Sequence, residues 1–342
     1  MFGTSAFAVP VLEAVAARHD VVGVVTQPDR PAGRGQRLVA TPVKRAADAR
    51  GLRVLTPERL RPFADEARAL GAEVFVVASY GKIVPQALLD LVPVAFNVHP
   101  SLLPLYRGAT PLQSAIRDGR NQTGVTIIAM DAGMDTGDVL LQETLAIGGA
   151  QTYGDLHDQT ARIGAAMAVE AIDRYAQGTL APRSQVELAT ERGITEAEIA
   201  ATLTRPLRKD DLKLPASATA RALVDFIRSR APEPSARVRE LEVAGQPDGS
   251  TGIGHVRIVR AHVSPIAPVV PAADAHLADG RLIVVDGHWF IKGTDGWIAI
   301  DELIPAGGRK MTMREYANGH KYTSPDVSPA SVRPLAEIVA AP

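Results

Sequence analysis

The first half of the chain alternates nearly continuous apolar runs, rich in valine and isoleucine, with stretches of helical periodicity. The apolar runs cover residues 20–25, 73–78 and 124–128, and the helical patterns cover residues 9–18, 42–50, 57–70 and 153–177. Apolar strands that alternate with helices are typical of a parallel sheet covered by helices on both faces. The pattern therefore predicts an α/β fold, with a doubly wound, mostly parallel sheet in the N-terminal half.

The first strand of this sheet is unusually short in the sequence. A doubly wound sheet places its first strand centrally, before the first turn and helix, but residues 2–5 already have the pattern of that turn. Because strands usually have about five to six residues, we expect about five to eight further residues upstream of Met1. The turn lacks the three-glycine dinucleotide fingerprint, so it does not predict NAD binding.

The second half of the chain follows a different pattern. Residues 181–205 have the composition of a linker, because proline, threonine and charged residues accumulate there. A helical pattern at 218–230 is followed by short apolar runs at residues 238–243, 255–259, 281–285, 289–292 and 297–300. Short strands with turn signals are typical of a small β-barrel. We therefore expect one domain at 1–180, a domain resembling an OB-fold at 206–330, and a tail at 331–342.

Composition limits the classes of protein. The 342 residues suit two domains of ordinary size, and 46% hydrophobic with 22% charged residues is typical of a globular protein. Without cysteine, neither disulfides nor cysteine-bound zinc can form. The sequence contains neither a long apolar run nor a signal-peptide pattern. We therefore expect a cytoplasmic protein without membrane contact, and we expect it to be a monomer.

Two clusters of basic residues stand out against a formal net charge of only −1. Residues 28–53 contain seven basic and two acidic side chains, and residues 205–239 contain nine basic and four acidic side chains, so each segment carries a net charge of +5. Either segment alone is compatible with an ordinary solvated face. Together they favour a polyanionic partner, because clustered arginine and lysine commonly neutralise phosphates.

Polar side chains gather at the ends of two predicted strands. Asn97 lies in a predicted strand at 94–98 and His99 directly follows it. The two side chains project from the same face, because side chains alternate along a strand. An aspartate-rich loop at residues 130–138 follows the strand at 124–128, and we expect both loops to converge at the carboxyl ends of parallel strands. An amide, an imidazole and a carboxylate would suit attack by an amine on a carbonyl. The residues alone equally permit a structural histidine and an ordinary turn.

Three motifs in order resemble those of the folate-dependent formyltransferases. They are Asn97-Val98-His99, Ser101-Leu102-Leu103-Pro104 with Arg107-Gly108, and Gly124-Val125-Thr126 with residues 131–137. The resemblance implies that Asn97, His99 and Asp135 are the catalytic residues and that Ser101, Leu102, Leu103 and Pro104 contact the folate. It also implies that the N-terminal domain holds 10-formyltetrahydrofolate as formyl donor and needs no metal. Residues 207–213 and 231–234 depart from the family pattern, whereas residues 301–318 resemble it.

A further run, Thr26 to Gly35, resembles the loop with which tRNA-specific members of this family reach the acceptor end of initiator tRNA. We therefore expect Arg30, Arg34 and Arg37 to bind tRNA, and we expect the formyl group to go to the amino group of methionyl-initiator-tRNA. Two alternatives remain at this point. The enzyme could formylate an amino sugar nucleotide, or the chain could bind tRNA without catalysis.

Overall fold

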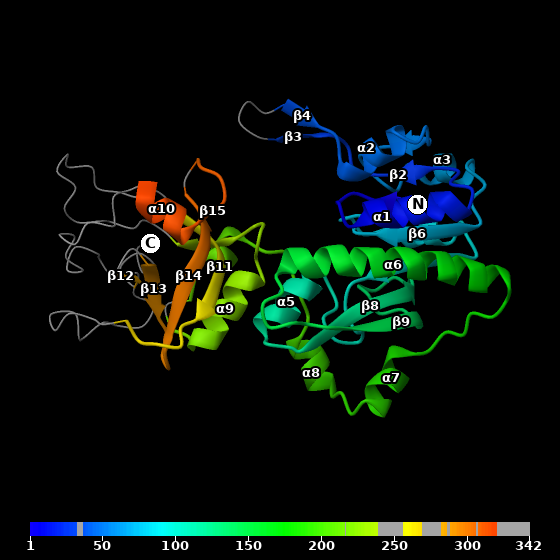
Figure 1. Cartoon of the computed structure of the whole chain (residues 1–342). Helices are drawn as coiled ribbons and strands as arrows, with labels where there is room; N and C mark the ends of the chain where they lie inside the picture. The colour runs from blue at the N-terminus through cyan, green and yellow to red at the C-terminus, as the bar shows by residue number, and fades with distance from the viewer. Residues whose placement is uncertain are drawn as a thin grey trace. The chain divides into compact units, whose positions relative to one another are not determined.

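The computed structural model divides the protein into two compact units, drawn as ribbons in Figure 1. Unit 1 comprises Met1–Leu112, Gln122–Ile147 and Asp155–Arg205, and unit 2 comprises Gln113–Asn121, Gly148–Gly154 and the chain from Pro206 onward. The structure describes residues 1–32, 37–215, 217–238, 256–268, 282–285, 288–305 and 307–319. The expected tail at 331–342 lies outside these residues.

Unit 1 contains a seven-stranded sheet with the order β5-β2-β1-β6-β7-β8-β9. The strands are β1 (Phe2–Gly3), β2 (Val24–Val25), β5 (Val54–Leu55), β6 (Val74–Ala78), β7 (Val94–His99), β8 (Gln122–Ala129) and β9 (Val139–Ala146). The strands from β5 to β7 are parallel, which confirms the predicted α/β sheet in this part. The short β1 pairs with β2 and β6 and lies in the middle of the five parallel strands.

The run at residues 124–128 departs from the prediction of parallel strands. It lies in β8, which is antiparallel to both β7 and β9, with His99 opposite Thr126. A parallel return needs a crossover that spans the length of the strands. The helix between β7 and β8, α5 (Pro111–Arg117), has seven residues and is only about 10 Å long, whereas the six residues of β7 span about 20 Å. Residues 100–121 would be long enough for a parallel crossover, but they contain only this short helix, and the chain re-enters the sheet at the end where it left.

Helices cover both faces of the parallel strands, as expected for strands that are apolar on both sides. Alternate residues of β6 show this directly: Val76 and Ala78 pack in one core cluster, and Phe75 and Val77 pack in another. The first cluster takes residues from α1, α2 and α6, and the second takes residues from α3 and α4. Their bounds are α1 (Ala8–Arg18), α2 (Pro42–Asp48), α3 (Ala64–Arg68), α4 (Gln86–Leu89) and α6 (Tyr153–Ala176).

The helix expected at residues 57–70 is much shorter than predicted. Only Ala64–Arg68 is helical, in α3. Pro62 lies inside the expected range, and a proline lacks the N–H of the helical ladder and disfavours helical geometry in the residue before it. Among the described residues, no helix has both the length and the apolar character needed to cross a membrane.

The segment at 181–205 differs from the expected linker. It carries two short helices, α7 (Gln185–Glu191) and α8 (Glu196–Ala201), and belongs to unit 1. Each helix begins with a capping box, in which a hydroxyl and a glutamate satisfy reciprocal backbone N–H groups: Ser184 with Glu187, and Thr195 with Glu198. This local chemistry forms helices where composition alone indicated a linker.

Unit 2 contains an antiparallel sheet with the order β10-β11-β14-β13-β12, and β15 pairs with β14. The strands are β10 (Ala236–Val238), β11 (Val256–Val263), β12 (Leu282–Val285), β13 (His288–Lys292), β14 (Trp297–Ile304) and β15 (Met311–Thr312). Leu223 and Ile227 of α9 (Ala220–Arg228) share a core with Ile258, Ile291 and Ile300, and α10 (Met313–Gly319) adds to it. The antiparallel sheet agrees with the predicted β domain, whereas most of the strand expected at 238–243 lies outside the described residues.

Candidate active site

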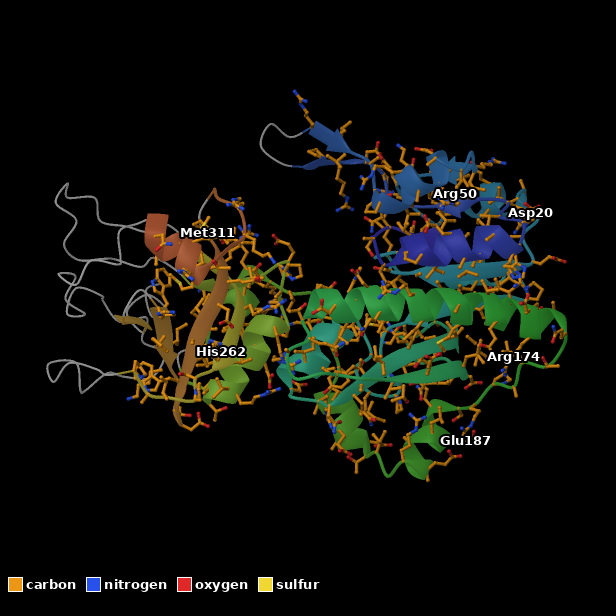
Figure 2. All side chains as sticks on the ribbon, in the orientation of Figure 1. Asp20, Arg50, Arg174, Glu187, His262 and Met311 are labelled. Carbon is orange, nitrogen blue, oxygen red and sulfur yellow. The ribbon has the colours of Figure 1, made fainter. Side chains whose placement is uncertain are left out.

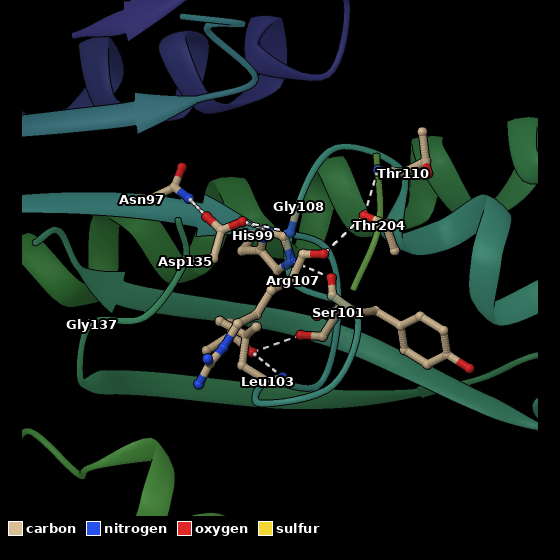
Figure 3. A network of polar contacts seen from close by, with 12 residues as sticks. Asn97, His99, Ser101, Leu103, Arg107, Gly108, Thr110, Asp135, Gly137 and Thr204 are labelled. Carbon is tan, nitrogen blue, oxygen red and sulfur yellow. Dashed lines mark hydrogen bonds and ion pairs between the residues drawn. The ribbon is translucent and has the colours of Figure 1, made fainter. Parts of the chain in front are cut away.

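The structure brings Asn97, His99 and Asp135 together, as Figure 3 shows. Asn97 and His99 lie on β7, two residues apart. The Nδ2 atom of Asn97 donates to Oδ1 of Asp135 at 3.1 Å, and Nδ1 of His99 lies 3.6 Å from Oδ2 of the same carboxylate. Asp135 therefore faces both polar side chains of the strand with its two oxygen atoms.

His99 is held in one orientation by a backbone group. Its ring is buried, and Nε2 lies 2.9 Å from the carbonyl oxygen of Tyr106. A carbonyl can only accept, so Nε2 carries a proton and donates it in this contact. The other ring nitrogen, Nδ1, faces Asp135 at a distance longer than a hydrogen bond. Nδ1 is consequently the ring nitrogen without a hydrogen bond among the described residues.

Asp135 has an uncommon backbone conformation. Its φ of 56° lies in the left-handed region, which aspartate tolerates better than most residues. The backbone N–H of Gly108 donates to Oδ2 at 2.8 Å. Nearby, a Cβ atom on Gly137 would lie 1.8 Å from the carbonyl oxygen of Ala129, so this close approach of the loop requires glycine.

The two loops do meet, but the prediction that they meet at the carboxyl ends of parallel strands is wrong. Because β8 runs antiparallel to β7, Ala129 at its end pairs with Phe96, before Asn97 along β7. The 130–138 loop thus leaves the sheet beside the first half of β7 and carries Asp135 back to His99. The side chains meet, but through a folded loop and not through parallel strand ends.

One buried glutamine that the sequence did not single out completes the site. Gln185, at the start of α7, donates from Nε2 to the backbone oxygens of Asp135 and Gly137, both at 2.8 Å. Its Oε1 atom accepts from Nε and Nη2 of Arg107 at 3.0 and 2.7 Å. Burial lowers the pKa of Arg107, while the charges of Asp135 and Asp131 oppose that change. Gln185 lies in the expected linker, where no sequence pattern marks it as functional.

The loop after His99 is tied to the end of unit 1. The backbone oxygen of Arg107 accepts from the backbone N–H and the hydroxyl of Thr204, each at 2.9 Å. The same hydroxyl accepts from the N–H of Thr110 at 3.0 Å (Figure 3). Gly108 has a φ of 101°, and a Cβ there would lie 2.1 Å from the oxygen of Thr204. Gly108, which supplies an N–H to Asp135, is therefore packed directly against Thr204.

The segment that we expect to contact folate is mostly enclosed by the protein itself. Ser101 and Leu103 are fully buried, and the hydroxyl of Ser101 donates to the oxygen of Leu105 at 2.8 Å. The oxygen of Leu103 accepts from Nε2 of Gln142 at 3.1 Å. Pro104 is also buried, and Leu102 is half-buried. Leu102 therefore supplies the accessible side chain among these four residues.

Two of the three predicted tRNA contacts, Arg30 and Arg37, lie on a hairpin of unit 1, formed by β3 (Arg30–Ala32) and β4 (Arg37–Val39). Arg30 and Arg37 are exposed, and Nη2 of Arg30 donates to Oε1 of Gln27 at 2.7 Å. Arg34 lies outside the described residues. Figure 2 shows the side chains on the hairpin standing clear of the sheet of unit 1.

The basic segment at 205–239 is not simply a surface patch. Arg228 and Arg230 are only 5% and 3% exposed. Nε of Arg228 pairs with Oδ1 of Asp225 at 2.6 Å, and the guanidinium of Arg230 lies 3.7 Å from the centre of the Phe226 ring. These charges serve internal contacts in unit 2. The net charge of the segment therefore overstates what it can offer to a polyanion.

Comparison with known proteins identifies the family of the chain. The Formyl transferase model matches residues 1–172, and the model of the Formyl transferase C-terminal domain matches residues 206–321. The chain therefore belongs to the formyltransferase family. Its similar curated relatives include the methionyl-tRNA formyltransferases of Bordetella pertussis, 47% identical over 69% of this chain and 76% of that protein, and of Halorhodospira halophila, 40% identical over 93% of this chain and 95% of that protein.

A solved structure with the same fold is the N-formyltransferase from Helicobacter canadensis, described in complex with folinic acid and dTDP-3-aminofucose. It has a TM-score of 0.59, covers 87% of this chain and 96% of its own, and is 18% identical in sequence. At that identity the likeness concerns the fold alone.

Proposed function

We propose that this chain transfers a formyl group from 10-formyltetrahydrofolate to the amino group of methionyl-initiator-tRNA. The observation that carries this proposal is the contact of Asn97, His99 and Asp135 in a chain that is 40% identical to a methionyl-tRNA formyltransferase over 93% of its length. The product is N-formylmethionyl-tRNA, the charged tRNA of translation initiation. The amino-sugar alternative has weaker support, because the sugar-modifying neighbour shares only the fold.

Asn97 suits stabilisation of the developing negative charge. The new bond joins the amine nitrogen of methionine to the formyl carbon, and negative charge then develops on the formyl oxygen. One N–H of the Asn97 amide is engaged by Asp135, which leaves the second N–H to donate to this oxygen. A fixed donor that is aimed at developing charge is among the largest contributions to catalysis.

His99 and Asp135 suit the movement of the proton. The attacking amine must lose a proton, and N10 of the leaving tetrahydrofolate must gain one as its bond to the formyl carbon breaks. Nδ1 of His99 is the ring atom free to carry that proton, because Nε2 is committed to Tyr106. The Asp135 carboxylate, 3.6 Å from Nδ1, faces this atom on the side where the proton would be exchanged.

The remaining assignments follow from family membership and from exposure. Leu102 and the backbone of residues 101–104 would contact the folate, and Arg30, Arg34 and Arg37 would bind tRNA phosphates. We assign the catalytic role to unit 1 and a tRNA-binding role to unit 2, whose antiparallel sheet would close into a barrel resembling an OB-fold. No step requires a metal ion.

The test is a formyl-transfer assay with 10-formyltetrahydrofolate as donor. Methionyl-initiator-tRNA and a dTDP-linked amino sugar are offered separately as acceptors, and formylated product is quantified by mass spectrometry. We expect formylmethionyl-tRNA and no formylated sugar. Formylation of the sugar with none of the tRNA would replace this proposal by the amino-sugar alternative, and tRNA binding without any product would favour a non-catalytic role.

A further inference from the structure

The loop that carries Asp135 has little apolar packing of its own. Asp131, Ala132, Gly133, Met134 and Thr136 are all exposed or half-buried, and Met134 keeps 61% of its surface. Packing against the core therefore cannot fix the left-handed backbone at Asp135. The conformation of the loop must depend on polar contacts.

Besides the contacts of the Asp135 carboxylate with Asn97 and Gly108, two side chains supply such contacts, and they act differently. The carboxylate of Asp131 accepts from the N–H of Gly133 at 3.0 Å and from the hydroxyl of Thr136 at 2.9 Å, so it closes the loop on itself. The amide of Gln185 comes from outside the loop and holds the backbone oxygens on both sides of Thr136. Gln185 thus attaches the loop to the rest of unit 1.

The Gln185 amide is saturated in this arrangement. Its two N–H groups both donate to the loop, and its oxygen accepts twice from Arg107, so all four hydrogen-bonding positions of the amide are used. The side chain is only 4% exposed, so water cannot easily replace these contacts. Arg107 in turn fixes which way the amide faces, because it can only donate. A reversed amide would place two N–H groups against the guanidinium.

We propose that Gln185 is a positioning residue for formyl transfer: its amide holds the backbone of residues 135–137, and thereby directs the Asp135 carboxylate at Asn97 and His99. This inference rests on the proposed function. Gln185 touches no reacting atom in this scheme, and it acts through Asp135. Its loss should therefore lower kcat and leave the KM for each substrate largely unchanged.

Two substitutions separate positioning from packing. Gln185→Ala removes every contact of the amide. Gln185→Glu keeps the size and the acceptor for Arg107, but it replaces both donors by an oxygen that faces two carbonyl groups. We expect each variant to lower kcat about 10- to 100-fold, because misplacement of a catalytic group by about 1 Å can cost about a hundredfold. Val186→Ala, at the exposed neighbouring position of α7, serves as the matched control with normal kcat.

A double-variant cycle tests whether the effect passes through Asp135. In an Asp135→Asn background, Gln185→Ala should lower kcat by no more than about a further twofold, whereas independent effects would multiply. Thermal unfolding of each variant is recorded alongside.

Three results would overturn the inference: normal kcat in Gln185→Glu, a full multiplicative loss in the double variant, or a drop in kcat explained by unfolding at the assay temperature. Failure of the wild-type protein to formylate methionyl-tRNA would instead refute the proposed function.

Discussion

Each unit contains a network of arginine and aspartate, half-buried in unit 1 and buried in unit 2, and the two networks differ in the hydrogen-bonding capacity that they leave unused. In unit 2, Oδ1 of Asp225 accepts from Arg228 at 2.6 Å and Oδ2 accepts from Arg221 at 3.0 Å. Arg228 also donates to the oxygens of Gly148 and Gln151, and Arg230 donates to the oxygen of Asp211. These contacts engage both oxygens of the buried carboxylate and both buried arginines.

In unit 1 the corresponding network is incomplete at its centre. Gln185 and Arg107 are engaged by protein groups, but the side chain of Asn97 has a single hydrogen bond among the described residues, and Nδ1 of His99 has no partner there within hydrogen-bond distance. A network of arginine and aspartate alone therefore does not identify a functional site, because both units have one. The distinguishing property is a fixed polar atom whose bonding capacity remains available for a substrate.

The strongest test of this contrast is removal of the carboxylate in unit 2. Asp225→Ala leaves Arg228 buried without its anionic partner, and breaking one side of a buried pair typically costs about 3–5 kcal/mol. We expect a large drop in the urea midpoint of unit 2, while kcat per folded molecule stays near the wild-type value. A variant with normal stability and greatly reduced turnover would show that Asp225 takes part in catalysis, and the two networks would then not differ in function.

The opposite result is expected for the site in unit 1. Asn97→Ala, His99→Ala and Asp135→Asn should each lower turnover about a hundredfold or more, since loss of one oxyanion donor alone has that effect. Their urea midpoints should fall less than that of Asp225→Ala, because none of these substitutions removes the partner of a buried arginine. Single-turnover formylation at saturating substrate measures the loss. Near-normal turnover in any of the three would remove that residue from the proposed mechanism.

A smaller effect is expected on the exposed hairpin, whose charges differ from the internal arginines of unit 2. Alanine at Arg30, Arg34 and Arg37 together should weaken methionyl-tRNA binding and reduce the slope of log affinity against log salt by about 0.7–0.9 for each phosphate that is no longer neutralised. Arg61→Ala, an exposed arginine elsewhere in unit 1, is the control. Coincident slopes for the triple variant and the wild type would show that the hairpin does not meet phosphates.

The smallest effect concerns a buried hydroxyl that no described group satisfies. Tyr80 is 2% exposed, its hydroxyl has no hydrogen-bond partner among the described residues, and burial raises its pKa to about 12. The folded state therefore favours the neutral phenol, so its contribution to stability is complete below pH 10 and is lost as the pH rises through 12. Tyr80→Phe should remove this alkaline loss and, at neutral pH, gain up to about 1 kcal/mol. Identical alkaline unfolding curves would contradict this.

The parallel strands and the three polar residues of the site were predicted from different kinds of signal in the sequence. Apolar runs such as the one at 73–78 predict buried parallel strands because their periodicity is local. The selection of Asp135 rested on family resemblance, since a loop rich in aspartate and glycine is compatible with many turns. The antiparallel β8 escaped prediction because strand direction depends on the path of the chain from 100 to 121, which periodicity does not encode.

Gln185 could not have been found by the same means. Its role depends on two backbone oxygens and one guanidinium that lie far from it in sequence, and a single buried glutamine has no signature of its own. The same limit applies to Arg228 and Arg230: their burial depends on Asp225, on Phe226 and on the loop at 148–154. Their charges therefore add to a basic segment in the sequence without reaching the surface of the folded unit.

The contacts that Gln185 and Thr204 make at the end of unit 1 limit where two related chains can be joined into a hybrid. Thr204 holds the loop of Arg107 and Gly108, and Gln185 holds the loop of Asp135, so both segments after residue 180 help to shape the site. A hybrid that joins this chain to a relative at Leu180 would combine the Asp135 loop of one parent with the segment after residue 180 of the other, which holds that loop. A junction placed after Arg205 keeps Gln185 and Thr204 with the loops that they hold, and it coincides with the end of unit 1.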